Sequence, residues 1–450
     1  MKQFLEAIKN IWKIDELRNR VGITLGLLLV YRVGAQVVLP GIDSDMLSGS
    51  EFSDRTGGGG LLGILNAFTG GAFAKASVFA LGIMPYISAS IVVQLMGIAV
   101  PYLLQKLQKE GESGRRTINQ ITRWLTIAIC IVQAPAYLYG LSALGVPESA
   151  FLLGKGPSFV FPSVIILVTG TIFAMWLGEK ITDKGIGNGI SLLITVGIIA
   201  TMPMSFYQEW DDKVIGNNGG VMMLLVELVI WVIVNGLCVL LVLAVRQIPV
   251  QYARRTAVGG YSKNQGSSRQ YIPLKLNASG VMPIIFAQAL MFAPAYLGQA
   301  IGSNAVGQWM TTSFSNIFGL WYNVLFGILI IVFTYFYTAI TVPTNKMADD
   351  LKRNGGFVPG IRPGGETANF LDRVMSHITF PGSLFLAAIA VLPAVAYQLL
   401  EINEGWALFY GGTSLLIMVG VAIDTIQQVN AYLLNRHYDG LMTTGNKRKG

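Results

Sequence analysis

The sequence predicts an all-α polytopic membrane protein that crosses the bilayer ten times, and three observations lead to this class. Of the 450 residues, 53% are hydrophobic and a further 52 are Gly, while charged residues make up 12%, about half the ~25% of an ordinary soluble domain. Ten segments are long and apolar enough to cross a ~30 Å hydrocarbon core as helices. The basic residues gather in alternate connections. The mean hydropathy of the chain is +0.56. This composition excludes soluble, coiled-coil and nucleic-acid-binding proteins.

The ten expected spans follow one another along the whole chain. They cover residues 21–39, 77–97, 121–141, 159–177, 190–206, 221–245, 278–297, 321–342, 378–399 and 407–429. An even number of spans puts both termini on the same side of the membrane. We therefore divide the chain into an amphipathic N-terminal segment (1–20), a first half (21–206), a second half (207–429) and a C-terminal tail (430–450).

The distribution of Lys and Arg predicts the orientation. If the termini are cytoplasmic, 26 of the 32 Lys and Arg residues lie in cytoplasmic segments and 4 lie in outer loops, with Arg32 and Arg123 inside or at the edge of spans. Cytoplasmic loops of membrane proteins carry such an excess of positive charge. We therefore expect both termini in the cytoplasm.

Two of the expected cytoplasmic connections, residues 246–277 and 343–377, are longer than the usual connection of about 2–8 residues between helices. Their basic residues include Arg246, Arg254, Arg255 and Arg362. One interpretation is that these cations hold the orientation and contact anionic lipids. The other is that long ordered loops dock a cytoplasmic partner.

A short apolar element lies between the first two spans, at residues 57–72. Four glycines at 57–60 precede it, and Gly70 and Gly71 follow it, so both of its ends have conformational freedom. An element of about two helical turns is too short to cross the membrane. It suits either a re-entrant helix or an amphipathic surface helix, and the sequence does not choose between them.

The chain carries no catalytic constellation, no cluster of metal ligands and no cofactor motif, so we do not expect an enzyme. Residues 185–189 are glycine-rich but lack the Lys-Ser/Thr pair of a phosphate loop. We interpret them as a tight turn that starts the fifth span, with Asn188 as the helix cap. Charges inside the spans are few, and Arg32, Glu227 and Asp424 resemble helix-packing or snorkelling groups more than a proton relay.

Isoleucine recurs beside the Pro and Gly residues that interrupt the spans. In two spans the isoleucines are four residues apart, which puts each pair on one helix face. The six residues are Ile83, Ile87, Ile190, Ile194, Ile285 and Ile417. Packing or lipid contact is the ordinary role of any one of them, so the pattern alone assigns no function.

Several stretches of the sequence resemble the SecY family of protein-conducting channels, which includes the eukaryotic Sec61α subunits. The stretches are residues 80–90, 109–116, 175–182, 185–191, 356–364 and 411–417. They occur in the family's order over nearly the whole chain. The resemblance implies two inverted, pseudo-symmetric halves of five helices around an hourglass pore that opens sideways to lipid.

The resemblance also implies roles for residues that the patterns leave open. It makes the six isoleucines a pore ring, and it makes the short element a plug. The plug residues are Leu61, Leu62, Ile64, Leu65, Asn66 and Phe68. The four arginines of the long loops become the docking site for cytoplasmic partners. A narrow aliphatic ring suits a polypeptide channel, because it blocks ions by dewetting and carries no charge that would trap a passing chain.

The implied function is translocation of unfolded preproteins across the bacterial plasma membrane and lateral release of transmembrane segments into it. The implied partners are SecE, SecG, the motor ATPase SecA, the ribosome, signal sequences and nascent preproteins, with SecDF and YidC as further candidates, besides the lipid bilayer. The alternatives are a secondary transporter built of inverted repeats and a membrane enzyme. The scarcity of carboxylates inside the spans and the long basic loops favour the channel.

Overall fold

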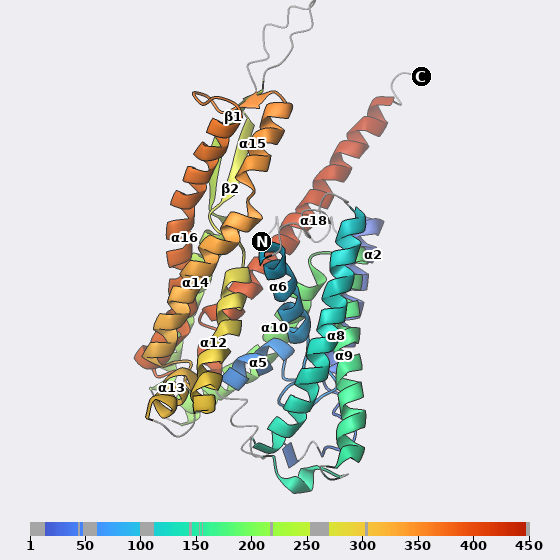
Figure 1. The fold of residues 1–450 in the computed structure, drawn as a ribbon, viewed down its shortest axis with the longest axis vertical. Helices are drawn as coiled ribbons and strands as arrows, with labels where there is room; N and C mark the ends of the chain where they lie inside the picture. Colours follow the sequence, from blue (N-terminus) through green and yellow to red (C-terminus); the bar gives the residue numbers. More distant parts are fainter. Residues whose placement is uncertain are drawn as a thin grey trace, which may run out of the picture. The chain divides into compact units, whose positions relative to one another are not determined.

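Long apolar helices make up most of the structure, a computed structural model that describes residues 14–43, 46–47, 61–99, 112–143, 146–152, 154, 156–216, 219–252, 270–301 and 305–446. The chain divides into two units (Figure 1). Unit 1 comprises Met1–Leu224, Glu401–Phe409 and Val421–Gly450, and unit 2 comprises Leu225–Leu400 and Tyr410–Gly420.

Ten helices overlap the ten predicted spans. They are α2 (Asp15–Gly34), α6 (Met84–Ala99), α8 (Glu112–Ala143), α9 (Pro157–Lys184), α10 (Gly189–Trp210), α11 (Gly220–Leu243), α12 (Met282–Ile301), α14 (Leu320–Thr341), α16 (Gly365–Leu400) and α18 (Gly412–Asn446). Among the described residues, seven helices are by themselves long and apolar enough to cross a membrane, and two shorter apolar helices cover Met84–Met96 and Met282–Met291. The prediction of a helical polytopic membrane protein is confirmed.

Several helix boundaries differ from the predicted windows, as the second and ninth spans illustrate. The sequence predicts the second span from residue 77, but residues 77–83 form a turn, in which Gly82 has a φ of +55°, and α6 begins only at Met84. The ninth span is predicted from residue 378, but α16 begins at Gly365. Hydropathy does not distinguish an apolar turn such as 77–83 from a helix, and it misses the polar turns of a helix that extend beyond the hydrocarbon core.

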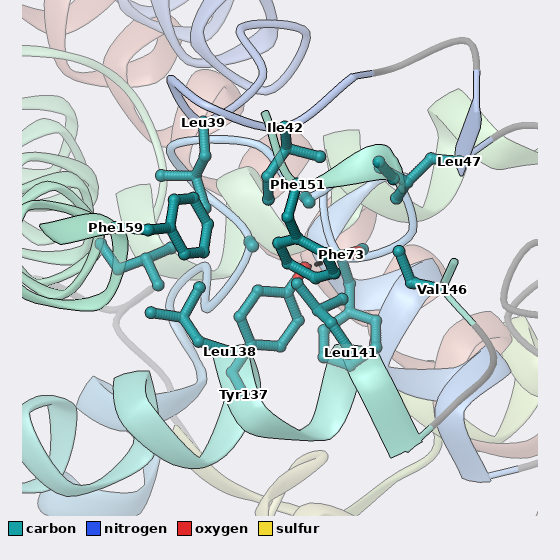
Figure 2. Close-up of a cluster of buried hydrophobic side chains, with 14 of the residues drawn as sticks. Leu39, Ile42, Leu47, Phe73, Tyr137, Leu138, Leu141, Val146, Phe151 and Phe159 are labelled. Atoms are coloured by element: carbon teal, nitrogen blue, oxygen red, sulfur yellow. Dashed lines mark hydrogen bonds between the residues drawn. The ribbon is translucent and has the colours of Figure 1, made fainter. Parts of the chain in front are cut away.

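A cluster of buried hydrophobic side chains joins α8 and α9 to the irregular segments of unit 1 (Figure 2). The rings of Tyr137 on α8 and Phe73 lie 4.9 Å apart, and the Tyr137 hydroxyl donates a hydrogen bond of 2.8 Å to the Phe73 carbonyl oxygen. Phe151 and Phe159 meet edge to face at 5.5 Å. The cluster therefore fixes the segment around Phe73 and also satisfies one of its buried backbone acceptors.

Unit 2 contains a small sheet that the sequence patterns did not lead us to expect. The strands β1 (Val245–Tyr252), β2 (Gln270–Lys275) and β3 (Gly356–Phe357) pair antiparallel in the order β2-β1-β3. The strands, α15 (Thr344–Arg353), the residue after β3 and α16 contribute the buried residues below the sheet, which are Ile248, Val250, Leu274, Leu351, Val358, Leu371 and Met375. Figure 1 shows β1 and β2 beside α15. The alternation of apolar residues at 248, 250, 272 and 274 is the signal that could have predicted the strands.

Gly170 allows α9 to approach the turn that precedes α6, because a Cβ atom there would overlap the backbone carbonyl of Val78. We expect Gly170→Val to lower the free energy of unfolding in detergent by about 1–3 kcal/mol, the usual cost of overpacking. The control is Gly236→Val in the middle of α11, where a Cβ atom would have no other atom within 4 Å. Equal loss of stability in the two variants, measured by chemical denaturation, would contradict the close approach at Gly170.

Candidate functional site

The short apolar element between the first two spans is helix α5 (Leu61–Thr69). The side chains of Ile64 and Phe68 are buried, with exposed fractions of 8% and 7%. α5 packs against α10. At the contact, a Cβ atom on Gly197 would lie 2.7 Å from the carbonyl oxygen of Phe68, so only glycine permits this approach. This packing favours a re-entrant helix over an amphipathic surface helix.

The chain reverses directly after α5, and two side chains of the helix hold the reversal. The Asn66 side-chain oxygen accepts a hydrogen bond from the backbone N–H of Ala74 at 3.0 Å. The Thr69 hydroxyl accepts one from the N–H of Phe73 at 3.1 Å. Asn66 is therefore a structural residue of the reversal, a role that the resemblance did not assign.

Arg32 of α2 binds the end of α5. Its Nη1 donates a hydrogen bond of 3.0 Å to the carbonyl oxygen of Gly70, whose φ is +66°. A Cβ atom on Gly70 would meet both this guanidinium group and the backbone of Gly197. Carbonyl groups at the C-terminal end of a helix carry partial negative charge, which a cation stabilises. The structure thus gives Arg32 a partner that sequence patterns could not identify.

The turn at residues 185–189 starts α10 as predicted. The Asn188 side-chain oxygen accepts hydrogen bonds from the N–H groups of Ile190 at 3.2 Å and Ser191 at 3.4 Å. Gly187 has a φ of +83°, a conformation that favours glycine. The interpretation as a capped tight turn is confirmed.

Helices from both ends of the chain hold this turn in place. The Thr24 hydroxyl of α2 accepts a hydrogen bond from the N–H of Ile186 at 3.0 Å. The Gln428 side chain of α18 accepts one from the N–H of Gly187 at 2.9 Å. The start of α10, with its two isoleucines, is therefore fixed against α2 and α18.

Four of the six isoleucines belong to unit 1. Ile83 directly precedes α6 and is buried, and Ile87 and Ile190 pack partly buried in the same cluster. Ile194 is buried one turn further along α10. The γ carbon of Ile190 also lies against Gly178 of α9. The structure therefore brings Ile83, Ile87 and Ile190 together.

The other two isoleucines belong to unit 2. Ile285 lies in the first turn of α12 and is partly buried. Ile417 lies in α18 and is 3% exposed. The start of α12 lies close to the third turn of α18, since a Cβ atom on Gly420 would lie 3.5 Å from the side chain of Val281.

The proposed docking arginines divide into described and undescribed positions. Arg246 is exposed on β1, opposite Leu274 of β2. The Arg362 side chain is exposed. The backbone carbonyl oxygen of Arg362 accepts a hydrogen bond of 2.8 Å from the Thr367 hydroxyl. Arg254 and Arg255 lie outside the described residues, as do the glycines at 57–60.

The bend around Arg362 is held by its neighbours. Gly360 and Gly364 have φ angles of +85° and +107°, and Pro363 restricts the backbone between them. Ile361 packs against the hydrophobic core below the sheet. Arg362 is therefore presented from a fixed turn rather than from a long free loop.

Sequence reasoning also missed the burial of two charged residues, Glu209 in the last turn of α10 and Lys213 in the π-helical turn (Asp211–Ile215) that follows. Glu209 and Lys213 are 1% and 3% exposed. The Glu209 carboxylate accepts a hydrogen bond of 2.8 Å from the N–H of Asn403, and the Lys213 ammonium donates one of 3.0 Å to the carbonyl oxygen of Glu401. The sequence suggested only an acidic outer loop here, whereas the side chains tie α10 to the segment 401–403.

Comparison with solved structures identifies the class of fold. A SecY structure from a study of how its plug domain stabilises the closed state of the translocation channel matches with a TM-score of 0.62, 17% identity and 92% coverage of each chain. Sec61 in the canine ribosome–channel complex from the endoplasmic reticulum matches with a TM-score of 0.57, 16% identity and 92% coverage of each chain. The helical bundle with its short enclosed helix is therefore a member of the protein-conducting channel fold.

Sequence comparison then identifies the family. The family model of SecY matches residues 77–426. Protein translocase subunit SecY of Streptomyces scabiei is 38% identical over 97% of this chain and 100% of its own length. The subunit of Bacillus subtilis (strain 168) is 37% identical over 97% of this chain and 99% of its own length. The chain belongs to the SecY family.

Loss of the Arg32 contact should loosen α5. We expect Arg32→Met to speed hydrogen–deuterium exchange in Leu61–Thr69 by roughly tenfold, because a hydrogen bond from a charged donor contributes about 1.5–3 kcal/mol and this one is only partly buried. Mass spectrometry of peptic peptides measures the exchange. The matched control is Lys184→Met, which removes an exposed cation at the end of α9. Unchanged exchange in the Arg32 variant would show that the contact does not hold the helix.

Proposed function

We propose that this protein is the pore-forming subunit of a protein translocase. It passes unfolded preproteins through the plasma membrane of a bacterium and releases transmembrane segments sideways into lipid. The observation that carries the proposal is the match over nearly the full length to subunits named as protein translocase SecY. The short apolar helix packed inside unit 1 supports it, because neither a solute transporter nor an enzyme requires such an element.

The constriction is proposed to consist of Ile83, Ile87, Ile190, Ile194, Ile285 and Ile417. All six lie at or near the beginning of a helix or in a buried stretch of one. Aliphatic side chains at a narrow point exclude water and therefore ions. The same side chains yield to any passing polypeptide, because they make no directional bonds that would have to be broken.

The plug is proposed to be α5, which closes the outer side of the pore at rest and leaves when a polypeptide enters. Its attachments suit reversible release. They include the hydrogen bond from Arg32, the close contact with Gly197 and two partly buried leucines, Leu62 and Leu65, against the cluster of Figure 2. The adjacent residues Gly70 and Gly71 have φ angles of +66° and +86°, so the chain can pivot there with little strain.

The cytoplasmic partner that drives transport, SecA or the ribosome, is proposed to bind at four arginines. They are Arg246, Arg254, Arg255 and Arg362. This proposal takes both termini as cytoplasmic, as the distribution of Lys and Arg predicts. The ordered core below β1, β2 and β3 supports it, because a rigid scaffold presents a cation at a defined position. A channel of this fold occurs in a ribosome–channel complex. SecE, SecG, SecDF and YidC are the further partners expected from the family.

Polar substitution of the ring should open the resting channel to ions. We expect the double variant Ile83→Asn and Ile417→Asn to raise resting conductance in planar bilayers about tenfold, the effect of lowering a dewetting barrier by about 1.4 kcal/mol. The control is Ile165→Asn on α9, where the side chain is 51% exposed. Resting conductance equal to that of the unchanged channel would exclude these residues from the constriction.

The docking proposal and simple attraction to lipid differ in whether Lys can replace Arg362. A bidentate contact with a carboxylate or phosphate requires the guanidinium group, whereas lipid attraction requires only the charge. We expect Arg362→Lys to lower the rate of motor-driven transport into reconstituted vesicles about tenfold, and Arg362→Glu to abolish it. Arg353→Lys, at an exposed position on α15, is the matched control. Transport by the Arg362→Lys variant at the unchanged rate would refute the docking role.

A further inference from the structure

A groove with a volume of about 650 Å³ lies between α8 and α9 of unit 1. This is within the range of about 300–1,000 Å³ that is typical of small-molecule sites. The two helices are neighbours in Figure 1. The groove belongs neither to the plug nor to the pore ring, and the proposed translocation of polypeptides does not use it.

Polarity changes in one direction along the groove. Arg123 on α8 and Asp183 on α9 lie at its charged end, near the start of one apolar span and the end of the other. Met175 and Ile172 line it two to three turns deeper along α9. This order matches the change from water through headgroups to hydrocarbon at the edge of a bilayer.

Two tryptophans lie where the charged end meets the apolar end. Trp124 is 71% exposed and Trp176 is 44% exposed, and both line the groove. The ammonium group of Lys180 lies 5.7 Å from the centre of the Trp176 ring. Tryptophan is enriched at the level of lipid headgroups because its ring is amphipathic. The groove therefore opens at the boundary between headgroups and acyl chains.

The charges at the polar end cancel. Arg123 donates from Nε and Nη2 to both carboxylate oxygens of Glu179, at 2.9 and 2.6 Å. The other two charged residues that line the groove are Lys180 and Asp183, one of each sign. Asp183 makes no ion pair within the part of the chain that the structure describes. An anionic ligand would gain no net attraction here. A ligand that carries both charges finds a partner for each.

We propose that this groove binds one zwitterionic aminophospholipid. The phosphate lies at Lys180 and the adjacent Arg123, and the primary ammonium donates hydrogen bonds to Asp183. Residues three apart on a helix are neighbours, about 5–6 Å between their Cβ atoms, which suits the two-carbon bridge between the phosphate and the amine of ethanolamine. An acyl chain follows Met175 and Ile172. A choline headgroup fits less well, because its methylated ammonium has no N–H donor.

The test is native mass spectrometry of the detergent-purified channel titrated with phosphatidylethanolamine, phosphatidylcholine and phosphatidylglycerol of identical acyl chains. We expect phosphatidylethanolamine to bind tightest. The double variant Lys180→Gln and Asp183→Asn keeps the net charge and the Arg123–Glu179 pair, and we expect it to bind that lipid about tenfold more weakly. The matched control is Lys346→Gln with Asp349→Asn, an exposed pair with the same spacing on α15.

Each result of the titration decides the proposal. Equal or tighter binding of phosphatidylglycerol by the unchanged channel would overturn the ligand class. Equal affinity of the double variant and the unchanged channel for phosphatidylethanolamine would overturn the site. Displacement of the lipid by glycerophosphoethanolamine at the same concentration would assign the groove to a soluble headgroup compound instead of a lipid.

A second measurement locates the lipid. Phosphatidylethanolamine with brominated acyl chains should quench tryptophan fluorescence of the unchanged channel more than brominated phosphatidylglycerol does. In a variant with Trp124→Phe and Trp176→Phe, this difference should disappear, because these two rings line the groove. Persistence of the difference would place the selective lipid contact elsewhere and refute the assignment to this groove.

Discussion

A stretch of irregular backbone inside a bundle of apolar helices is the constraint on which the architecture of unit 1 depends. Between the end of α5 and the start of α6, the chain forms turns and one isolated bridge, which pair only part of its N–H and C=O groups. Unpaired buried groups of this kind are costly in an apolar interior. Asn66, Thr69, Arg32 and Tyr137 supply partners, each from a side chain to the backbone. Non-helical chain is therefore stabilised among the spans by turn hydrogen bonds of its own backbone together with these side chains.

The same constraint explains how the proposed plug can be both ordered and releasable. Hydrogen bonds from side chains to backbone hold the end of α5, and they can be replaced by bonds to water when the helix leaves. Its apolar contacts are made with α10, where Phe68 meets Gly197, and with the cluster of Figure 2, which Leu62 and Leu65 contact. α10 also begins with Ile190 and Ile194. Within unit 1, α10 thus contacts the proposed plug and carries two residues of the proposed ring, so a movement of α10 would displace both.

Unit 2 solves a different problem, that of keeping long polar connections ordered outside the apolar spans. Antiparallel pairing of β1 with β2 fixes one connection, and β3 joins it to the next. Side chains from α15 and α16 cover the inner face with a core of their own. A sheet edge, a short helix and a turn are then held by packing, and charged residues such as Arg246 and Arg362 extend from a rigid base. Binding to such a base loses less conformational entropy than binding to a flexible loop.

The sequence by itself determined the membrane class, the ten helices and the capped turn at Asn188, because hydropathy and local hydrogen bonding act over one span or one turn. It also located the short element within residues 57–72, and several of its stretches resemble the SecY family in the family's order. The sequence did not reveal that α5 packs against α10, which group Arg32 contacts, or how the strands at 245–252 and 270–275 pair. Those features depend on contacts between segments tens to hundreds of residues apart, such as Arg32 with Gly70 and Gly187 with Gln428. Only the folded chain brings such groups within hydrogen-bonding distance, so the tertiary structure decided them.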